Sequence, residues 1–284
     1  MRDEELVGFL QWALPRAGLR WRGFRRVRRQ VGRRLSRRLQ ELGVADLAAY
    51  RLLLEACPDP KSDEWRRLAR MCRVTISRFY RDRRVWAQLR RHLLPDIVQH
   101  AVRAGHEELL FWSAGCASGE EPYTLALAWQ HDLAWRWPAI ACRIVGTDVD
   151  RVVLGRAADG VYDASSLREL PRHWREASFR PEGQSWRIAD SLREAVSFVE
   201  HDVERAPPLA GADLVLCRNL VFTYLHEAGQ RRFLAKLSAQ ARAESPLVIG
   251  CHESLPPNAG FGPHPLGHPI YYRQPSTSAP RGVL

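Results

Sequence analysis

The sequence lacks the features that mark secreted, zinc-binding and membrane-spanning chains. Its six cysteines are scattered and form no CxxC pair, so neither a metal site nor a disulfide framework is expected. No apolar run approaches the roughly 20 residues that a membrane span needs. The opening MRDEELVGFL does not have the basic-then-apolar order of a signal peptide. We therefore expect a soluble cytoplasmic protein with reduced thiols and no bound metal.

Carboxylates are missing from the stretch that carries the positive charge. Residues 16–38 hold eleven arginines and neither Asp nor Glu, while the whole chain of 284 residues has a formal charge of +11. The charge is thus a local feature, and two interpretations are open. The arginines could form a solvated helix face, or they could attract an acidic partner over a distance. A nucleic-acid backbone would be attracted just as well.

Helical periodicity dominates the first 90 residues, where no convincing strand occurs. Apolar residues recur three or four positions apart, as one buried helix face requires: Phe24, Val27, Val31, Leu35, Leu39 and Leu42. The opposite face would then be basic, with Arg25, Arg26, Arg29, Arg33 and Arg37 pointing outward. Further helices are expected over 47–55 and 65–71, separated by the CPDPKSD turn.

After Gly105 the pattern changes to short apolar runs separated by helical stretches. The runs are LLFWSA (109–114), CRIVGTD (142–148), AVSFVEHD (195–202), DLVLCRN (213–219) and PLVIGCHE (246–253). Such alternation predicts an α/β fold with a parallel sheet covered on both faces. In these sheets the ligand crevice lies beyond the carboxyl ends of the strands. Polar residues near those ends should converge there: Glu120, Glu121, Asp148, Asp202 and Asn219.

The strongest local signal is FWSAGCASGEEPYTLAL (111–127), an apolar strand followed by a small-residue loop and a helix. Gly115 and Gly119 allow the backbone to approach a ligand closely, although the GxGxxG spacing is absent. Carboxylates at 120 and 121 suit a cationic amine better than a phosphate, or they merely favour the first turn of a helix. Asp148 could accept hydrogen bonds from a ribose, or it could cap the next helix, a role that Asp150 fills equally well.

Six motifs, taken in order, resemble those of the CheR chemoreceptor methyltransferases. They are VTISRFYRD (74–82), WSAGCASGEEPYTLAL (112–127), GTDVD (146–150), FVEHDV (198–203), LCRN (216–219) and IGCHESLP (249–256). The resemblance covers roughly residues 20–273. It implies a basic, all-α N-terminal domain with its linker helix over 1–90. It also implies a Rossmann-like class I methyltransferase domain over 91–284, with a mostly parallel seven-stranded sheet. A small β-subdomain is expected over 173–198.

The resemblance also implies S-adenosylmethionine as the methyl donor and assigns roles to residues. Glu121 would hold the methionine amino group, Asp148 the ribose, and Asp202 with Val203 the adenine. Cys217 and Arg218 would form the backbone edge of the pocket, next to the loop at Gly115. Thr75, Ser77 and Arg81 would contact the donor, and Arg81 and Tyr224 would act in catalysis. The acceptor implied is a glutamate on a chemoreceptor helix, met by the basic N-terminal helix, and not a nucleic acid.

The sequence departs from the family pattern at three of these positions. Thr75 stands where the family usually has Asn, Ser77 where it has Thr, and Tyr224 lies one residue later than the family's tyrosine. The differences at Thr75 and Tyr224 keep open a methyltransferase of the same fold that acts on a small molecule or another protein. The eleven-arginine stretch keeps open a second alternative, a donor-sensing or nucleic-acid-binding regulator without turnover.

Overall fold

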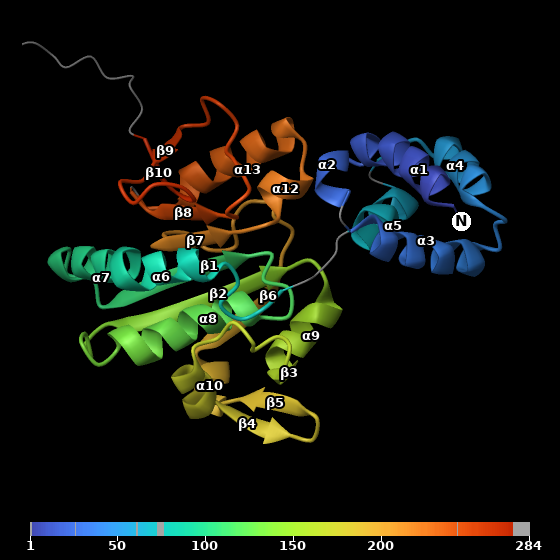
Figure 1. Ribbon diagram of the computed structural model, residues 1–284. Helices are drawn as coiled ribbons and strands as arrows, with labels where there is room; N and C mark the ends of the chain where they lie inside the picture. The colour runs from blue at the N-terminus through green and yellow to red at the C-terminus, as the bar shows by residue number, and fades with distance from the viewer. Residues whose placement is uncertain (1, 26, 61, 73–76, 243, 275–284) are drawn as a thin grey trace, which may run out of the picture. The chain divides into compact units, whose positions relative to one another are not determined.

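The computed structural model describes residues 2–25, 27–60, 62–72, 77–242 and 244–274 (Figure 1). Two compact units are present, one formed by Met1–Thr75 with Val221–Gln230 and the other by Ile76–Leu220 with Arg231–Leu284. The domain boundary expected near residue 90 stays a prediction. Within the described ranges, no helix is long and apolar enough to cross a membrane.

The first unit is helical, as expected. Its helices are α1 (Asp3–Arg16), α2 (Trp21–Phe24), α3 (Arg28–Leu42), α4 (Leu47–Ala56), α5 (Asp63–Cys72) and α12 (Val221–Tyr224), with the start of α13 (Glu227–Gln240). The apolar face predicted from residue 24 onward is divided between α2 and α3, because the backbone leaves the helical conformation at Val27. Val31, Leu35 and Leu39 are buried along α3.

An ion-pair network ties three helices of this unit together. Arg38 of α3 bonds Glu64 of α5 at 2.5 Å, and the hydroxyl of Tyr50 in α4 donates to the same carboxylate at 2.6 Å. Tyr50 is fully buried, and burial together with this carboxylate raises the pKa of its hydroxyl. Asp46 begins α4 by accepting a hydrogen bond from the backbone N–H of Ala49, so this helix has a side-chain cap.

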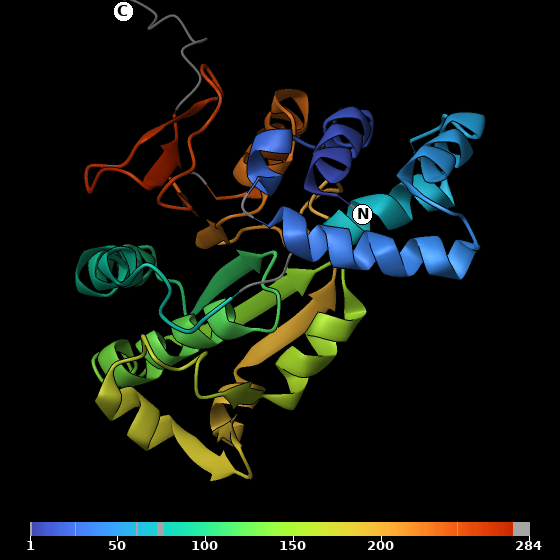
Figure 2. The same ribbon diagram turned by 45° about the vertical axis from the view of Figure 1, so that its right-hand side comes forward.

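The second unit is built around a seven-stranded sheet with the order β6-β2-β1-β7-β8-β10-β9 (Figures 1 and 2). The strands are β1 (Glu108–Ala114), β2 (Ala141–Asp148), β6 (Val196–Glu200), β7 (Leu214–Cys217), β8 (Pro246–Ile249), β9 (Phe261–Pro263) and β10 (Ile270–Arg273). The first five are parallel, and β10 is antiparallel to both β8 and β9. The five predicted strands are thus confirmed, as is the α/β class.

Helices pack against this sheet and close its core. They are α6 (Arg83–Gln88), the π-helix η1 (Leu89–Leu93), α7 (Leu94–Arg103), α8 (Glu120–Ala128), the π-helix η2 (Trp129–Leu133), α9 (Arg151–Asp159), α11 (Asp190–Glu194) and the rest of α13. The residues of β7 and β8 are all buried, which explains their continuous apolar sequence. Trp86, Phe111 and Leu214 lie in one buried cluster with many other apolar side chains.

A second, three-stranded antiparallel sheet interrupts the unit between β2 and β6. Its strands β3 (Val161–Asp163), β4 (Phe179–Glu182) and β5 (Ser185–Ile188) have the order β3-β5-β4, and α10 (Arg172–Ser178) precedes β4. Figure 1 shows β4, β5 and α10 set apart from the large sheet. The RPEGQSW segment forms the hairpin turn between β4 and β5, while β3 lies before residue 173, where the expected subdomain began.

Close packing at Gly23 generates a stability prediction for the helical unit. A Cβ at this position would lie 2.5 Å from the backbone oxygen of Thr223, whereas a Cβ at Gly8 would meet nothing within 4 Å. Gly23→Ala should therefore lower the free energy of unfolding by about 1–3 kcal/mol through overpacking. Gly8→Ala, the matched control in α1, should raise it by roughly 0.5–1 kcal/mol. Urea unfolding followed by circular dichroism checks both, and equal effects of the two substitutions would contradict the packing at Gly23.

Candidate functional site

The strand order reverses between β1 and β7, and in open α/β sheets such a reversal marks the ligand crevice at the carboxyl ends of the strands. From β1 the chain moves outward through β2 to β6, and from β7 it moves the other way through β8. Ligands of open α/β sheets bind at such a switch point. The residues that follow β1 and β7 are the small-residue loop 115–119 and the pair Arg218–Asn219. Both segments were predicted to line the site.

The loop after β1 is held in a conformation that depends on small residues. Gly115 has φ of +75°, and a Cβ there would lie 2.5 Å from the side chain of Leu220. Gly119 has φ of +88° and begins α8, where a Cβ would lie 2.9 Å from Ala157. The N–H groups of Gly115 and Cys116 both donate to the carbonyl of Thr147 in β2. The backbone of this loop is therefore fixed before any ligand arrives.

Asp148 ends β2 and is joined to the same loop. Its Oδ2 accepts a hydrogen bond from the N–H of Ala117 at 3.1 Å, and its Oδ1 accepts one from the N–H of Asp150 at 3.0 Å. Asp150, not Asp148, caps α9 by accepting from Val152. The helix-cap alternative for Asp148 is therefore wrong. Asp148 therefore joins the end of β2 to the loop after β1, next to the switch point.

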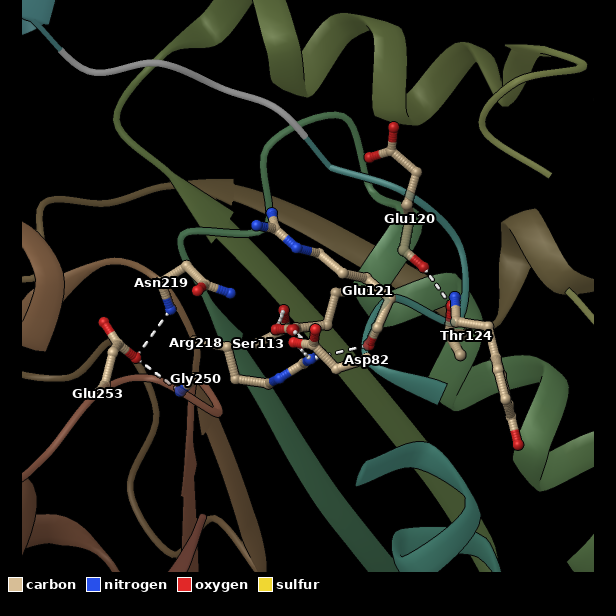
Figure 3. Close-up of polar contacts among 11 residues, drawn as sticks. Asp82, Ser113, Glu120, Glu121, Thr124, Arg218, Asn219, Gly250 and Glu253 are labelled. Atoms are coloured by element: carbon tan, nitrogen blue, oxygen red, sulfur yellow. Dashed lines mark hydrogen bonds and ion pairs between the residues drawn. The ribbon is translucent and has the colours of Figure 1, made fainter. Parts of the chain in front are cut away.

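Glu121 lies in the first turn of α8 and spans the switch point (Figure 3). Its Oε1 accepts from the hydroxyl of Ser113 in β1 at 2.8 Å, and its Oε2 pairs with Nη1 of Arg218 at 3.0 Å. The side chain of Arg218 is only 2% exposed. Glu121 thus does more than favour a helix terminus, because it links the loop after β1 to the end of β7.

The guanidinium of Arg218 also holds the segment that contains Arg81. Nη2 of Arg218 donates to Oδ2 of Asp82 at 2.7 Å and to the carbonyl oxygen of Arg81 at 2.9 Å. Figure 3 shows Arg218 between the carboxylates of Glu121 and Asp82. Arg218 therefore contributes its side chain, where only a backbone edge was expected. The roles of Asp82 and Ser113 were not predicted from the sequence.

Three carboxylates gather around the buried thiol of Cys116. Burial raises the pKa of this thiol, and the charges of Asp148, Glu121 and Glu120 raise it further, in that order. These carboxylates place negative charge beside the loop, and Arg218 offsets part of it. Carboxylates beside such a loop fit a cationic amine joined to a hydroxyl-bearing nucleoside, which are the groups of S-adenosylmethionine.

Glu120 differs from Glu121 because it points into the protein. It is 5% exposed, and its Oε2 has no hydrogen-bond partner among the described residues. Burial raises the pKa of its carboxyl, and hydrogen bonds from Ser77 and Ser166 oppose this shift only in part. The carbonyl oxygen of Glu120 accepts from the hydroxyl of Thr124, whose oxygen in turn accepts from the N–H of Tyr80. Glu120 therefore connects α8 to the segment before Arg81.

Of the remaining predicted residues that the structure describes, some belong to the unit with the large sheet and one, Tyr224, belongs to the helical unit. Asp202 follows β6, which pairs with β2, and its Oδ1 accepts from the N–H of Glu204. Val203 and Cys217 are buried, at 7% and 0% exposure. Tyr224 belongs to the helical unit, where its ring packs on Phe24 with 4.8 Å between centroids. Thr75 lies outside the described residues. The ligand roles of all these residues stay predictions.

The carboxylate of Glu253 joins the ends of β7 and β8. Oε2 of Glu253 accepts from the N–H groups of Asn219 and Gly250, at 2.9 and 2.6 Å (Figure 3). Asn219 has φ of +56°, a left-handed conformation that Asn tolerates better than most residues. Glu253 itself is 6% exposed. These two hydrogen bonds fix the backbone directly after Arg218, and no local sequence pattern indicated them.

Comparison with known proteins agrees with this geometry. Residues 75–263 match the family described as CheR methyltransferase, SAM binding domain. A chemotaxis protein methyltransferase of Listeria monocytogenes is 30% identical over 200 residues, which cover 70% of this chain and 73% of that protein. One from Klebsiella aerogenes is 31% identical over 235 residues, covering 80% and 76%. A 104.1 kDa uncharacterised protein of Rhodobacter capsulatus is 32% identical over 227 residues; the match covers 79% of this chain, which spans only 23% of that protein.

The parallel sheet with its switch point, together with the family match, defines a class I methyltransferase that uses S-adenosylmethionine. When bound, this cofactor supplies an activated methyl group on a sulfonium. The chain belongs to the CheR methyltransferase family. The resemblance inferred from the six motifs is confirmed.

Burial of Glu120 generates a pH-dependent prediction. Its pKa is raised in the folded state, so the folded protein binds this proton more tightly than the unfolded chain does. Stability must therefore fall as pH rises above the ordinary value of 4.5. Glu120→Gln cannot ionise, so we expect it to be more stable than the wild type at pH 7.5, with a difference that shrinks toward pH 4.5. Urea unfolding at several pH values measures this.

The control for this prediction is Glu107→Gln, because Glu107 is exposed. Its stability difference from the wild type should stay the same across the pH range. A Glu120→Gln variant whose difference is likewise constant with pH would contradict the burial of the Glu120 charge.

Proposed function

We propose that this protein methylates glutamate side chains on the cytoplasmic helices of a chemoreceptor, and that it works in the cytoplasm. The observation that carries the proposal is the contact of Arg218 with both Glu121 and the carbonyl of Arg81. Arg218 thus connects Glu121, which suits the amine of the donor, to the segment of Arg81, which suits the carboxylate of the acceptor. The printed names of the Listeria and Klebsiella relatives support the choice of acceptor.

In the proposed reaction, the main task of the protein is to align the acceptor carboxylate with the methyl group of the donor. A glutamate carboxylate is ionised at neutral pH, since its reference pKa is about 4.3, and it needs no general base. One of its oxygens forms a bond to the methyl carbon while the carbon–sulfur bond breaks and leaves its electron pair on sulfur. The products are a methyl ester and S-adenosylhomocysteine, and no proton is transferred. Proximity and orientation therefore supply most of the rate enhancement.

Arg81 is the proposed orienting group for the acceptor. It is half-buried, and both neighbours in the chain have left-handed backbone, with φ of 58° at Tyr80 and 65° at Asp82. A guanidinium offers a planar fork of donors that matches a carboxylate. Complete neutralisation would weaken the nucleophile, so Arg81 is proposed to align the carboxylate. The catalytic part proposed for Tyr224 is to help position the same group.

The basic face of α3 is the proposed docking surface for the receptor. Arg25, which precedes α3, and Arg29, Arg33 and Arg37 along it are exposed, while Arg26 lies outside the described residues. Arginines on the other face have partners: Arg28 pairs with Asp3 and Arg38 with Glu64. The spacing of four residues aligns the exposed arginines along one side of the helix. Such a stripe complements an acidic helix of the partner.

The decisive assay for the proposed function measures ester formation. The full chain with labelled S-adenosylmethionine and receptor cytoplasmic fragments should yield methyl groups that alkali releases as methanol. Arg81→Ala should lower this rate by about 100-fold or more, because misplaced reactants lose rate steeply. Its affinity for S-adenosylhomocysteine should stay within about 10-fold of the wild type, since orientation and donor binding are separate contributions.

Two results would contradict this assignment. Label on none of several cognate receptor fragments would favour another acceptor or a regulator without turnover. Equal loss of donor affinity and methylation in Arg81→Ala would mean that Arg81 holds the donor and does not orient the acceptor.

The docking surface makes a separate prediction about recognition. Replacing Arg29, Arg33 and Arg37 together by Ala should raise KM for the receptor fragment roughly 10-fold with little change in kcat, because steering acts on encounter. The dependence of KM on salt should also weaken. Arg103, Arg143 and Arg156 are exposed too, so their triple replacement by Ala changes the net charge equally. If that control raised KM as much, the effect would come from overall charge and not from α3.

A further inference from the structure

The guanidinium of Arg218 contacts both the donor side and the acceptor side of the proposed site. Nη1 pairs with Glu121, which is proposed to bind the donor's amine. Nη2 donates to Asp82 and to the carbonyl of Arg81, which is proposed to orient the acceptor. The distances are 3.0, 2.7 and 2.9 Å, so all three contacts are made at once (Figure 3).

The segment around Arg81 depends on such anchors because its backbone is unusual. Tyr80 and Asp82 have left-handed φ values of 58° and 65°, and such residues persist only where their surroundings hold them. Tyr80 is held on one side, since its N–H donates to Thr124 and its hydroxyl accepts from Arg90 at 3.0 Å. On the other side, Asp82 is held by Arg218.

The charges of this cluster do not balance. Two carboxylates, Glu121 and Asp82, face one guanidinium, so the formal charge is −1. The side chain of Glu121 is 14% exposed, that of Asp82 26% and that of Arg218 only 2%. Little water therefore screens these charges. A cation placed at Glu121 would balance the cluster. It would also compete with Nη1 of Arg218 for the Glu121 carboxylate and leave the guanidinium to Asp82 and the Arg81 carbonyl.

We propose that Arg218 is a positioning residue that couples donor binding to the conformation of the segment Phe79–Asp82, and thereby to Arg81. This inference rests on the proposed function for the parts played by Glu121 and Arg81. An amine bound at Glu121 strengthens the hold of Arg218 on Asp82 and on the Arg81 carbonyl. By linkage, an acceptor that binds Arg81 then tightens the donor by the same factor, in the range of about 5- to 150-fold that such couplings show.

A guanidinium is needed for this coupling because its donors are fixed in a plane and point in different directions. Lysine carries the same charge but concentrates its donors at a single atom. Arg218→Lys would therefore keep a cation in the cluster and lose the simultaneous hold on Glu121, Asp82 and the Arg81 carbonyl. Asp82→Asn keeps the shape of the side chain and removes the charge through which the segment is held.

The test is amide hydrogen exchange of the segment 79–82 in the full chain, with and without saturating S-adenosylhomocysteine. The wild type should show slower exchange when this ligand is bound, by about 5-fold or more. Arg218→Lys and Asp82→Asn should bind the ligand, as measured by calorimetry, and show less than half of that slowing. Arg242→Lys is the matched control: Arg242 pairs with Asp213, which immediately precedes β7 at the amino end of that strand, and should behave as the wild type.

Two outcomes would overturn the proposal. One is equal slowing in the wild type and in both variants at saturating ligand; the other is no slowing in the wild type. Asp82→Asn decides the question if Arg218→Lys does not fold. The experiment needs no acceptor, so a failure to methylate chemoreceptors would leave its result standing. Conversely, methylation by a protein whose segment 79–82 does not respond would refute the coupling alone.

Discussion

The ion pair between Arg218 and Glu121 crosses the point at which the parallel sheet changes direction, and the site depends on it. The loop after β1 and the residues after β7 also meet where the side chain of Leu220 packs against Gly115. A buried guanidinium is costly unless its donors find acceptors, and here three are supplied by Glu121, Asp82 and the Arg81 carbonyl. Nη1 and Nη2 of Arg218 find acceptors in these contacts, whereas its buried Nε has no partner among the described residues. The contacts made by Nη1 and Nη2 bring the segments of the crevice together. The bonds of Arg218 that stabilise the crevice are therefore the same ones that place the residues proposed to act in it.

The central sheet was predictable because each of its parallel strands is buried on both faces. Such strands have continuous apolar sequences, and the five predicted runs contain β1, β2, β6, β7 and β8. The shorter strands carry no such signal. β9 consists of Phe261–Pro263 with a glycine between, and β3 has only three residues, of which one is buried. Their pairing partners, not their own residues, determine that they are strands, so the full extent of the antiparallel insertion could not be derived locally.

The site was predictable to the extent that it follows strand ends. Glu121 and Asp148 were found because carboxyl ends of parallel strands share one edge, and Asp150 had already been identified as an alternative cap for α9. Asp82 was missed, since it lies 136 residues from Arg218 and no periodicity links the two. The burial of Glu120 was missed for a similar reason. Adjacent glutamates at the start of a helix look alike in sequence, yet they point to different sides of it, one toward Arg218 and one toward Ser77 and Ser166.

The electrostatics of the crevice impose an order on the proposed reaction. Glu121, Asp82 and Asp148 make the crevice electronegative, which favours a cationic donor and repels the carboxylate of an acceptor. S-adenosylmethionine carries one net positive charge, from its amine and sulfonium less its carboxylate, whereas S-adenosylhomocysteine carries none. An occupied crevice is therefore less repulsive to a carboxylate before methyl transfer than after it. The acceptor loses its own charge in the same step, because an ester is neutral, so its attraction to the arginine proposed to orient it, Arg81, would fall as well. For the proposed reaction, this charge distribution favours binding of the donor before the acceptor and release of the acceptor once the methyl group has moved.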